Sequence, residues 1–297
     1  MIYAFYKFFL HFLLRLPDTF FKVLFVIIFP IYKALHTKRA YGRVENLLQA
    51  TGFSSGTSGR IQINAREVFK SIYWNGIDSY RLLARIPSAT SRVRYENEDV
   101  IKDALAQGPI IALSIHQGAF ENLHRSLCRY SENVHLITSP FKSTGLTQAL
   151  HEIRSDKNLH EYATEEIASV LRSLFKTKGI LAMVVDQARD ARGNNVTLFG
   201  KQSTLYLRLP EKANQMGAGI VTFRTWNENV RRGNKEIREH VVQFEKYYPP
   251  KYGKKDVPPT AETVLVNEIA QEIETWISEH PEQWTWNYHG NFRKTIK

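Results

Sequence analysis

One histidine stands where a buried strand is expected to end. Residues 109–115 are a continuous apolar run that predicts a buried strand, and His116 follows directly. Gly118 then opens a predicted helix at 118–130, which carries Glu121 in its first turn. A histidine at this place can act as a general base, and a nearby carboxylate can fix the imidazole tautomer and raise its basicity. The alternative is a histidine that only packs at the strand end or caps it.

The spacing of a histidine and an acid five positions later is not informative by itself. Three other pairs in the chain share it, namely His151/Asp156, His160/Glu165 and His240/Glu245. Only His116 follows a continuous apolar run and precedes a glycine-containing turn. Context, rather than spacing, therefore marks His116 and Glu121 as the candidate catalytic pair.

Two further charged segments follow predicted elements. Arg154 begins the sequence Arg-Ser-Asp-Lys at 154–157, after a predicted helix. Asp186 and Gln187 end a predicted strand at 179–185. Each segment on its own is also compatible with solvated surface. Three ionisable sites at the ends of strands or helices nevertheless suit a catalytic cleft.

Motifs for cofactors and for covalent catalysis are missing or out of context. The chain has no Gly-x-Gly-x-x-Gly, Walker loop, His-Glu-x-x-His or cysteine pair, so we expect neither a nucleotide cofactor nor a metal. Cys128 is the single cysteine, which excludes an intrachain disulfide. Residues 52–56 match the nucleophile elbow Gly-x-Ser-x-Gly, but a helical pattern precedes them where an elbow needs a strand. We therefore expect a flexible loop there.

Short apolar runs and helical periodicities alternate from residue 93 onward. We expect strands at 109–115, 133–138, 179–185, 218–224 and 240–244, and helices at 118–130, 144–153, 164–175 and 260–279. This alternation predicts an α/β fold, with active groups at the carboxyl ends of the strands. Residues 36–92 are expected to be mostly helical, and the polar segments 227–236 and 246–259 are expected to be surface loops.

The first 35 residues are far more apolar than the rest. Their longest stretch without a charged residue or histidine is 23–32, which is shorter than the ~20 residues a spanning helix needs. Polar side chains recur on one helix face at Lys7, His11, Arg15, Asp18 and Lys22. We therefore expect residues 1–35 to be interfacial membrane-anchoring helices and residues 36–297 to form a single domain. A helix packed on the protein's own core and a tilted membrane span are the alternatives.

The net charge of +11 points to an anionic partner. Nucleic acid, anionic lipid headgroups and an acidic protein all fit that charge. A nucleic-acid interface would interleave aromatic residues with Lys and Arg on one element. The aromatic residues cluster instead at 3–32 and 284–292, so we expect a membrane surface rather than nucleic acid.

Several of these segments, in this order, resemble the late acyltransferases of lipid A biosynthesis, the lauroyl and myristoyl transferases within the lysophospholipid acyltransferase group. His116 and Glu121 match that family's His-x4-Asp/Glu motif, and 153–157 is similar to its Leu-Arg-Ser-Asn-Lys segment. Asp186-Gln187 and the Val-Thr-Leu-Phe-Gly at 196–200 match its next two motifs. Its closing signature is matched by the Pro-Glu-Gln-Trp-Thr-Trp at 281–286, His289 and Arg293-Lys294.

The resemblance implies a mixed sheet flanked by helices, as in glycerolipid acyltransferases, with an N-terminal helical anchor. It implies O-acyl transfer from an acyl carrier protein or acyl-CoA thioester to a hydroxyl of a lipid acceptor, a lipid A-type glycolipid, at the cytoplasmic face of the inner membrane. His116 would be the general base and Glu121 would hold its ring. Arg154 would hold a phosphate or the oxyanion, and Asp186 and Gln187 would support or bind the acceptor. An acyltransferase for another lyso-lipid and a non-catalytic lipid- or anion-binding membrane protein are the alternatives.

Overall fold

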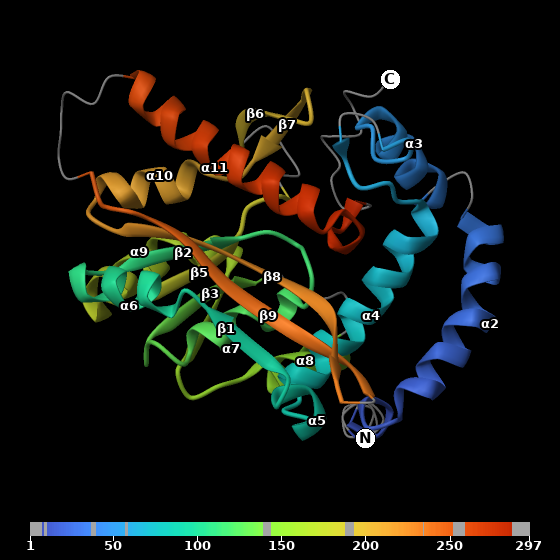
Figure 1. The fold of residues 1–297 in the computed structure, drawn as a ribbon. Coiled ribbons are helices and arrows are strands. Elements are labelled where there is room, and N and C mark those ends of the chain that lie inside the picture. The colour runs from blue at the N-terminus through green and yellow to red at the C-terminus, as the bar shows by residue number, and fades with distance from the viewer. Residues whose placement is uncertain are drawn as a thin grey trace.

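A seven-stranded sheet forms the centre of the protein (Figure 1). Its order is β1 (Val93–Glu96), β9 (Lys235–Tyr248), β8 (Gly219–Arg232), β2 (Ile110–Ser114), β5 (Ile180–Val184), β3 (Val134–Thr138) and β4 (Leu159–Ala163). Strands β8 and β9 pair antiparallel, and every other neighbouring pair is parallel. The predicted α/β class, a mixed sheet flanked by helices, is confirmed.

The computed structural model describes residues 8, 11–36, 40–56, 59–138, 144–187, 193–233, 235–251 and 259–286. Lys7 of the N-terminal polar stripe lies outside these residues. So do His289, Arg293 and Lys294 of the closing signature.

Helices cover both faces of the sheet, which is why β5 and the first four residues of β2 are apolar throughout. Along β2, Ile111 and Leu113 belong to one hydrophobic cluster, whereas Ile110 and Ala112 belong to the other. The first cluster includes side chains of α9 (Ile167–Thr177), α10 (Arg208–Gln215) and α11 (Pro259–Glu279). The second includes side chains of α6 (Glu98–Gln107) and α7 (Leu123–Leu127).

The N-terminal helices stand at one end of the sheet (Figure 1). They are α2 (Asp18–His36), α3 (Gly42–Ala50), α4 (Ala65–Leu83) and the short α5 (Pro87–Thr90). Asn64 begins α4 with a reciprocal capping box, in which its side chain accepts from the backbone of Glu67 and the Glu67 carboxylate accepts from the backbone of Asn64. The helical prediction for 36–92 is confirmed for these elements, and the described residues 52–56 form turns rather than an elbow.

Two expectations from the sequence differ from the structure. The predicted helix at 118–130 is a 3-10 turn, η3 (Phe120–Asn122), followed by only the five residues of α7. The predicted loop at 227–236 lies mostly within the long β8–β9 hairpin, and β9 extends to Tyr248. Polar residues persist in this hairpin because its outer half is exposed, while its backbone groups are paired across the ladder.

Several elements are not among those that the sequence analysis predicts, although α6 and α10 are amphipathic helices with a buried apolar face. They are β1, β4, α6, α10 and the separate hairpin of β6 (Asn194–Leu198) and β7 (Lys201–Leu205). The helix α8 (Thr144–Arg154) was anticipated. The structure adds two more short turns, η4 (Thr164–Glu166) and η5 (Pro281–Gln283).

One face of α2 packs against α4. Phe21, Phe25 and Phe29 are spaced by four residues and are buried on this face. The Phe25 ring lies 5.2 Å from the ring of Tyr73, whose hydroxyl donates to the Phe21 carbonyl at 3.0 Å. Phe25 and Phe29 join the same hydrophobic cluster as β2. One face of α2 therefore packs on the protein's own core, as the alternative to an interfacial helix predicted.

One residue of the polar stripe, Asp18, forms an ion pair within the protein. Arg81 of α4 donates to the Asp18 carboxylate at 2.6 Å and to the carbonyls of Leu14 and Leu16 at 3.0 and 2.6 Å. The boundary at residue 35 stays a prediction, and among the described residues Phe25 and Phe29 of α2 belong to the main hydrophobic cluster of the protein.

Replacing Phe25 with alanine should therefore destabilise the whole protein. We expect a loss of about 3 kcal/mol, because a large buried ring leaves a cavity. The matched control is Val26→Ala, on the outward face of the same helix and 64% exposed. Its cost should stay within about 0.5 kcal/mol. Urea unfolding in detergent, followed by tryptophan fluorescence, measures both. Equal effects would mean that α2 is not part of the folded core.

Candidate active site

The register of two parallel strands brings His116 and Asp186 together. Strands β2 and β5 pair with Ser114 opposite Val184, and the backbone N–H of Val185 donates to the Ser114 carbonyl at 3.0 Å. Each site residue lies two positions beyond its paired residue, at the carboxyl end of its strand. His116 Nδ1 lies 2.7 Å from Asp186 Oδ1, and the backbone N–H of His116 donates to Asp186 Oδ2 at 3.0 Å.

This contact determines the tautomer of His116. An ionised carboxylate can only accept hydrogen bonds, so the proton of a neutral imidazole resides on Nδ1. The lone pair that can take up a proton is then on Nε2. Both side chains are nearly buried, with His116 8% and Asp186 5% exposed. The pair therefore has the arrangement of a general base and its orienting carboxylate.

The C-terminal segment at residues 284–285 packs against this pair and forms hydrogen bonds with it. The indole Nε1 of Trp284 donates to Asp186 Oδ2 at 2.9 Å, which makes a third donor to the carboxylate. Trp284 also forms a β-bridge with Gln117. The backbone N–H and the hydroxyl of Thr285 both donate to the His116 carbonyl, at 3.0 and 3.1 Å. Sequence reasoning singled out 281–286 only by resemblance and assigned no role to Trp284.

Gly118 makes room for the turn that follows the histidine. Its φ of +57° is in the left-handed region that favours glycine. A Cβ at this position would lie 2.6 Å from the carbonyl oxygen of Thr225 on β8. The backbone N–H of Gly118 donates to the Gln283 carbonyl at 3.2 Å, so the turn is also held by the C-terminal segment.

Glu121 takes a different place from the one expected. Its carboxylate accepts a hydrogen bond from Arg154 Nη2 at 3.2 Å, whereas the ring nitrogen of His116 meets Asp186. The reason is that residues 120–122 form a 3-10 turn rather than the first turn of a long helix. This turn places the ring of Phe120 edge-on against the imidazole, with the centroids 4.7 Å apart. Asp186 thus holds the position that the sequence analysis gave to Glu121.

Arg154 is engaged by two carboxylates. Besides Glu121 at 3.2 Å, it lies 3.9 Å from Glu161 on β4. Burial, reinforced by the positive charges of Arg154 and Arg125, lowers the pKa of the neighbouring His124 to about 3. His124 is therefore neutral at physiological pH. Gln187 is half-buried directly after Asp186.

The other histidines with the same spacing have other partners. His151 is exposed and pairs with Glu161 at 3.2 Å rather than with Asp156. His240 is buried, and its Nδ1 bonds to the side chain of Asn227.

Burial raises the pKa of the Cys128 thiol to about 12, which leaves it unreactive as a nucleophile. Among the described residues, no group of three His, Cys, Asp or Glu side chains could hold a metal ion.

Comparison with known proteins places the chain in a family. No curated protein sequence matches it. A solved structure, the 1-acyl-sn-glycerophosphate (LPA) acyltransferase PlsC from Thermotoga maritima, is 11% identical and covers 82% of this chain and 99% of its own, with a TM-score of 0.38. The sequence profile of the bacterial lipid A biosynthesis acyltransferases matches residues 67–294, which contain every site residue described above. The chain belongs to the bacterial lipid A biosynthesis acyltransferase family.

Proposed function

We propose that the protein transfers a fatty acyl chain from an acyl carrier protein or acyl-CoA thioester to a hydroxyl of a lipid acceptor, a lipid A-type glycolipid. The observation that carries the proposal is the buried pair of His116 and Asp186 at the carboxyl ends of two adjacent parallel strands. Family membership supports the acyltransferase class.

The proposed reaction needs no covalent intermediate. His116 Nε2 takes the proton of the acceptor hydroxyl while the oxygen attacks the thioester carbonyl. Collapse of the tetrahedral intermediate breaks the carbon–sulfur bond, and the imidazolium returns its proton to the leaving thiolate. One ester and one thiol result. Asp186 stabilises the imidazolium, and general-base help of this kind supplies about 10²–10⁴-fold.

Glu121 and Arg154 complete the proposed site as a second pair. Arg154 is proposed to stabilise the oxyanion, and Glu121 to orient its guanidinium through their 3.2 Å contact. Gln187 is proposed to help bind the acceptor, because it directly follows Asp186. No cofactor is needed for this chemistry.

The outward face of α2 is proposed to lie in the membrane. Apolar side chains are exposed along it, at Phe20, Val23, Val26, Ile27, Ile28, Ile31 and Leu35. By length and composition α2 could cross a bilayer. However, the guanidinium of Arg66 on the adjacent α4 lies 6.0 Å from the Phe29 ring, and Lys70 is exposed on the same helix. A spanning α2 would carry these charges into the hydrocarbon, so an in-plane position at the cytoplasmic face of the inner membrane fits better.

His116→Ala should lower kcat by at least about a hundredfold while the fold and lipid binding stay intact. Asp186→Asn should cost a similar factor, and the double variant little more, because the two residues act as one unit. Glu121→Gln should cost less than Asp186→Asn, since its contact is with Arg154. Initial rates with labelled donor measure these effects, and lipid mass spectrometry names the acceptor by its added acyl mass.

The control is His151→Ala, because His151 shares the spacing but is exposed. Its kcat should stay within about twofold of wild type. Wild-type activity in a His116 variant would contradict the assignment of His116 as the general base. If the mass of the intact protein increases by one acyl group after incubation with donor alone, the reaction proceeds through a covalent acyl-enzyme rather than by direct transfer.

Trp284→Phe should change the pH dependence of catalysis through Asp186. The variant removes one of the donors that stabilise the Asp186 charge, and a hydrogen bond to a charged group contributes about 1.5–3 kcal/mol. The carboxylate then holds the imidazolium more strongly, so the acidic limb of the kcat/KM profile should move to higher pH.

The matched control for Trp284 is Trp286→Phe. Trp286 is equally buried, and its Nε1 donates to the Pro281 carbonyl at 2.7 Å instead of to Asp186. This variant should lose comparable stability but keep its pH profile. Identical profiles for the two variants would mean that Trp284 acts only through packing.

Membrane binding should depend on the outward face of α2. Val23→Asp combined with Ile27→Asp should weaken binding to vesicles that contain anionic lipid by at least about tenfold, because apolar burial is lost. Val264→Asp on α11 is the control, since Val264 is a comparably exposed aliphatic residue elsewhere. Co-sedimentation with vesicles measures the difference. Equal binding by both variants would contradict the interfacial position.

A further inference from the structure

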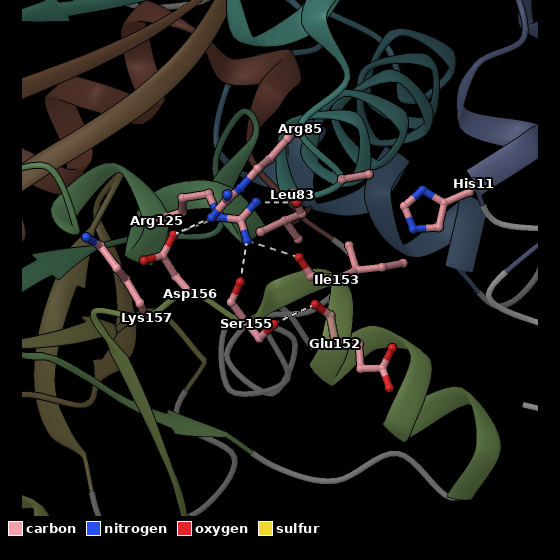
Figure 2. A pocket seen from close by; sticks show the side chains of 10 residues that line it. His11, Leu83, Arg85, Arg125, Glu152, Ile153, Ser155, Asp156 and Lys157 are labelled. Carbon is pink, nitrogen blue, oxygen red and sulfur yellow. Dashed lines mark hydrogen bonds and ion pairs between the residues drawn. The ribbon is translucent and has the colours of Figure 1, made fainter. Parts of the chain in front are cut away.

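A pocket of about 660 Å³ lies beyond the Arg154 pair, and Figure 2 shows its lining. Four parts of the chain form it: the N-terminal segment with His11, the end of α4 with the two residues after it, Arg125 of α7, and the end of α8 with the residues up to Lys157. Ile153 and Ser155, on either side of Arg154, both line the pocket. The pocket therefore begins one residue away from the proposed catalytic site.

Positive charge is concentrated in this pocket. Arg85 lies 2.7 Å from the Asp156 carboxylate, and Arg125 lies 4.0 Å from the same carboxylate. Burial and the nearby charge of Arg85 lower the pKa of the Arg125 guanidinium. In Figure 2 the carboxylate of Glu152 points away from the two arginines. Asp156 is thus the acidic side chain of the lining that faces this pair, while Lys157 adds a further positive charge.

The arginines differ in how firmly they are held. Arg125 donates to the backbone carbonyls of Leu83, Ile153, Arg154 and Ser155, which fixes its guanidinium in the wall. Its Nε has no hydrogen-bond partner among the described residues. The side chain of Arg85, in contrast, is 65% exposed. Arg85 lies two residues after the end of α4 and has a φ of +54°, a left-handed conformation that is uncommon for a residue other than glycine.

We propose that this pocket binds a phosphate group carried by one of the two substrates, with Arg85 and Lys157 as its direct ligands and Arg125 as a fixed positive wall. Guanidinium groups bind phosphate through paired, charge-assisted hydrogen bonds, and an ammonium adds a point charge. Arg85 can turn from Asp156 to a phosphate because it is mostly exposed. This inference rests on the proposed acyl transfer, because it names a recognition group for that reaction.

Two sources of phosphate fit the position. A phosphorylated lipid acceptor would approach from the side of His11, which belongs to the segment next to α2 and the proposed membrane face. A donor would instead present the phosphate of the pantetheine arm that acyl carrier protein and coenzyme A share. The shared chemistry is a phosphate ester, and the kinetic constants of the two substrates separate the sources.

The test measures KM for donor and acceptor separately in Arg85→Gln, Lys157→Gln and the double variant. We expect the KM of one substrate to rise about tenfold for Arg85→Gln and further in the double variant, with kcat changed less than about threefold, since the lost hydrogen bonds act on substrate binding rather than on the chemical step. A raised acceptor KM assigns the phosphate to the lipid, and a raised donor KM assigns it to the pantetheine arm. Arg85→Lys should restore part of the affinity.

Matched controls are Arg231→Gln in the β8–β9 hairpin and Lys102→Gln on α6, both exposed cations outside the pocket. They should leave both KM values within about twofold. Unchanged KM values in the double variant would overturn the proposal. So would increases that the controls reproduce, since these would report net charge only.

A second measurement needs no turnover. Inorganic phosphate, added at constant ionic strength, should raise the melting temperature of the wild-type protein more than that of the double variant. Equal responses would overturn the pocket as a phosphate site. A wild-type protein that is stabilised through the pocket but transfers no acyl group to any lipid would refute the proposed function while leaving the phosphate chemistry of the pocket in place.

Discussion

The carboxylate of Asp186 is the point on which the site depends. It accepts from the ring and the backbone of His116 and from the indole of Trp284. Burying a carboxylate charge without hydrogen-bond donors would cost free energy, so these donors are needed to stabilise the charge of Asp186. The contacts tie together three segments that are far apart in the sequence, the ends of β2 and β5 and the segment after α11. The orientation of the proposed base follows from this arrangement.

The C-terminal segment is a structural part of the candidate active site. A β-bridge joins Trp284 to Gln117, and Thr285 holds the His116 carbonyl. Gln283 links this segment to β8, because its side chain accepts from the Asn227 backbone N–H and donates to the Asn227 carbonyl, both at 2.8 Å. The tight turn at Gly118 is therefore held by hydrogen bonds to the C-terminal segment.

The N-terminal helices connect the site to the proposed membrane face. One side of α2 is buried in the same hydrophobic cluster as the central strands, and the other side exposes aliphatic residues. Arg81 joins the start of α2 to α4, and the end of α4 leads into the wall of the basic pocket. A lipid approaching along α2 would thus meet positive charge before it reaches the Arg154 pair. The order of elements fits an acceptor whose headgroup is anionic.

The sequence by itself determined the α/β class, the strands that end at His116 and Asp186, and the family. Each of these depends on local patterns, namely apolar runs, glycine turns and short motifs. The strands at 218–224 and 240–244 are confirmed as parts of β8 and β9, but the outer half of their hairpin escaped prediction because it is polar. β1 and β4 escaped prediction because they are short and only partly buried.

Only the tertiary structure decided which acid meets the histidine. Spacing along the chain favoured Glu121, five positions away, because a regular helix was expected after Gly118. The pairing of Ser114 with Val184 instead places Asp186 beside His116, seventy positions away. β2 and β5 are neighbours in the sheet although β3 and β4 lie between them in the chain, so no local pattern in the sequence reports that their ends meet. The same reason explains why Trp284 was recognised as part of a motif but not as a partner of Asp186.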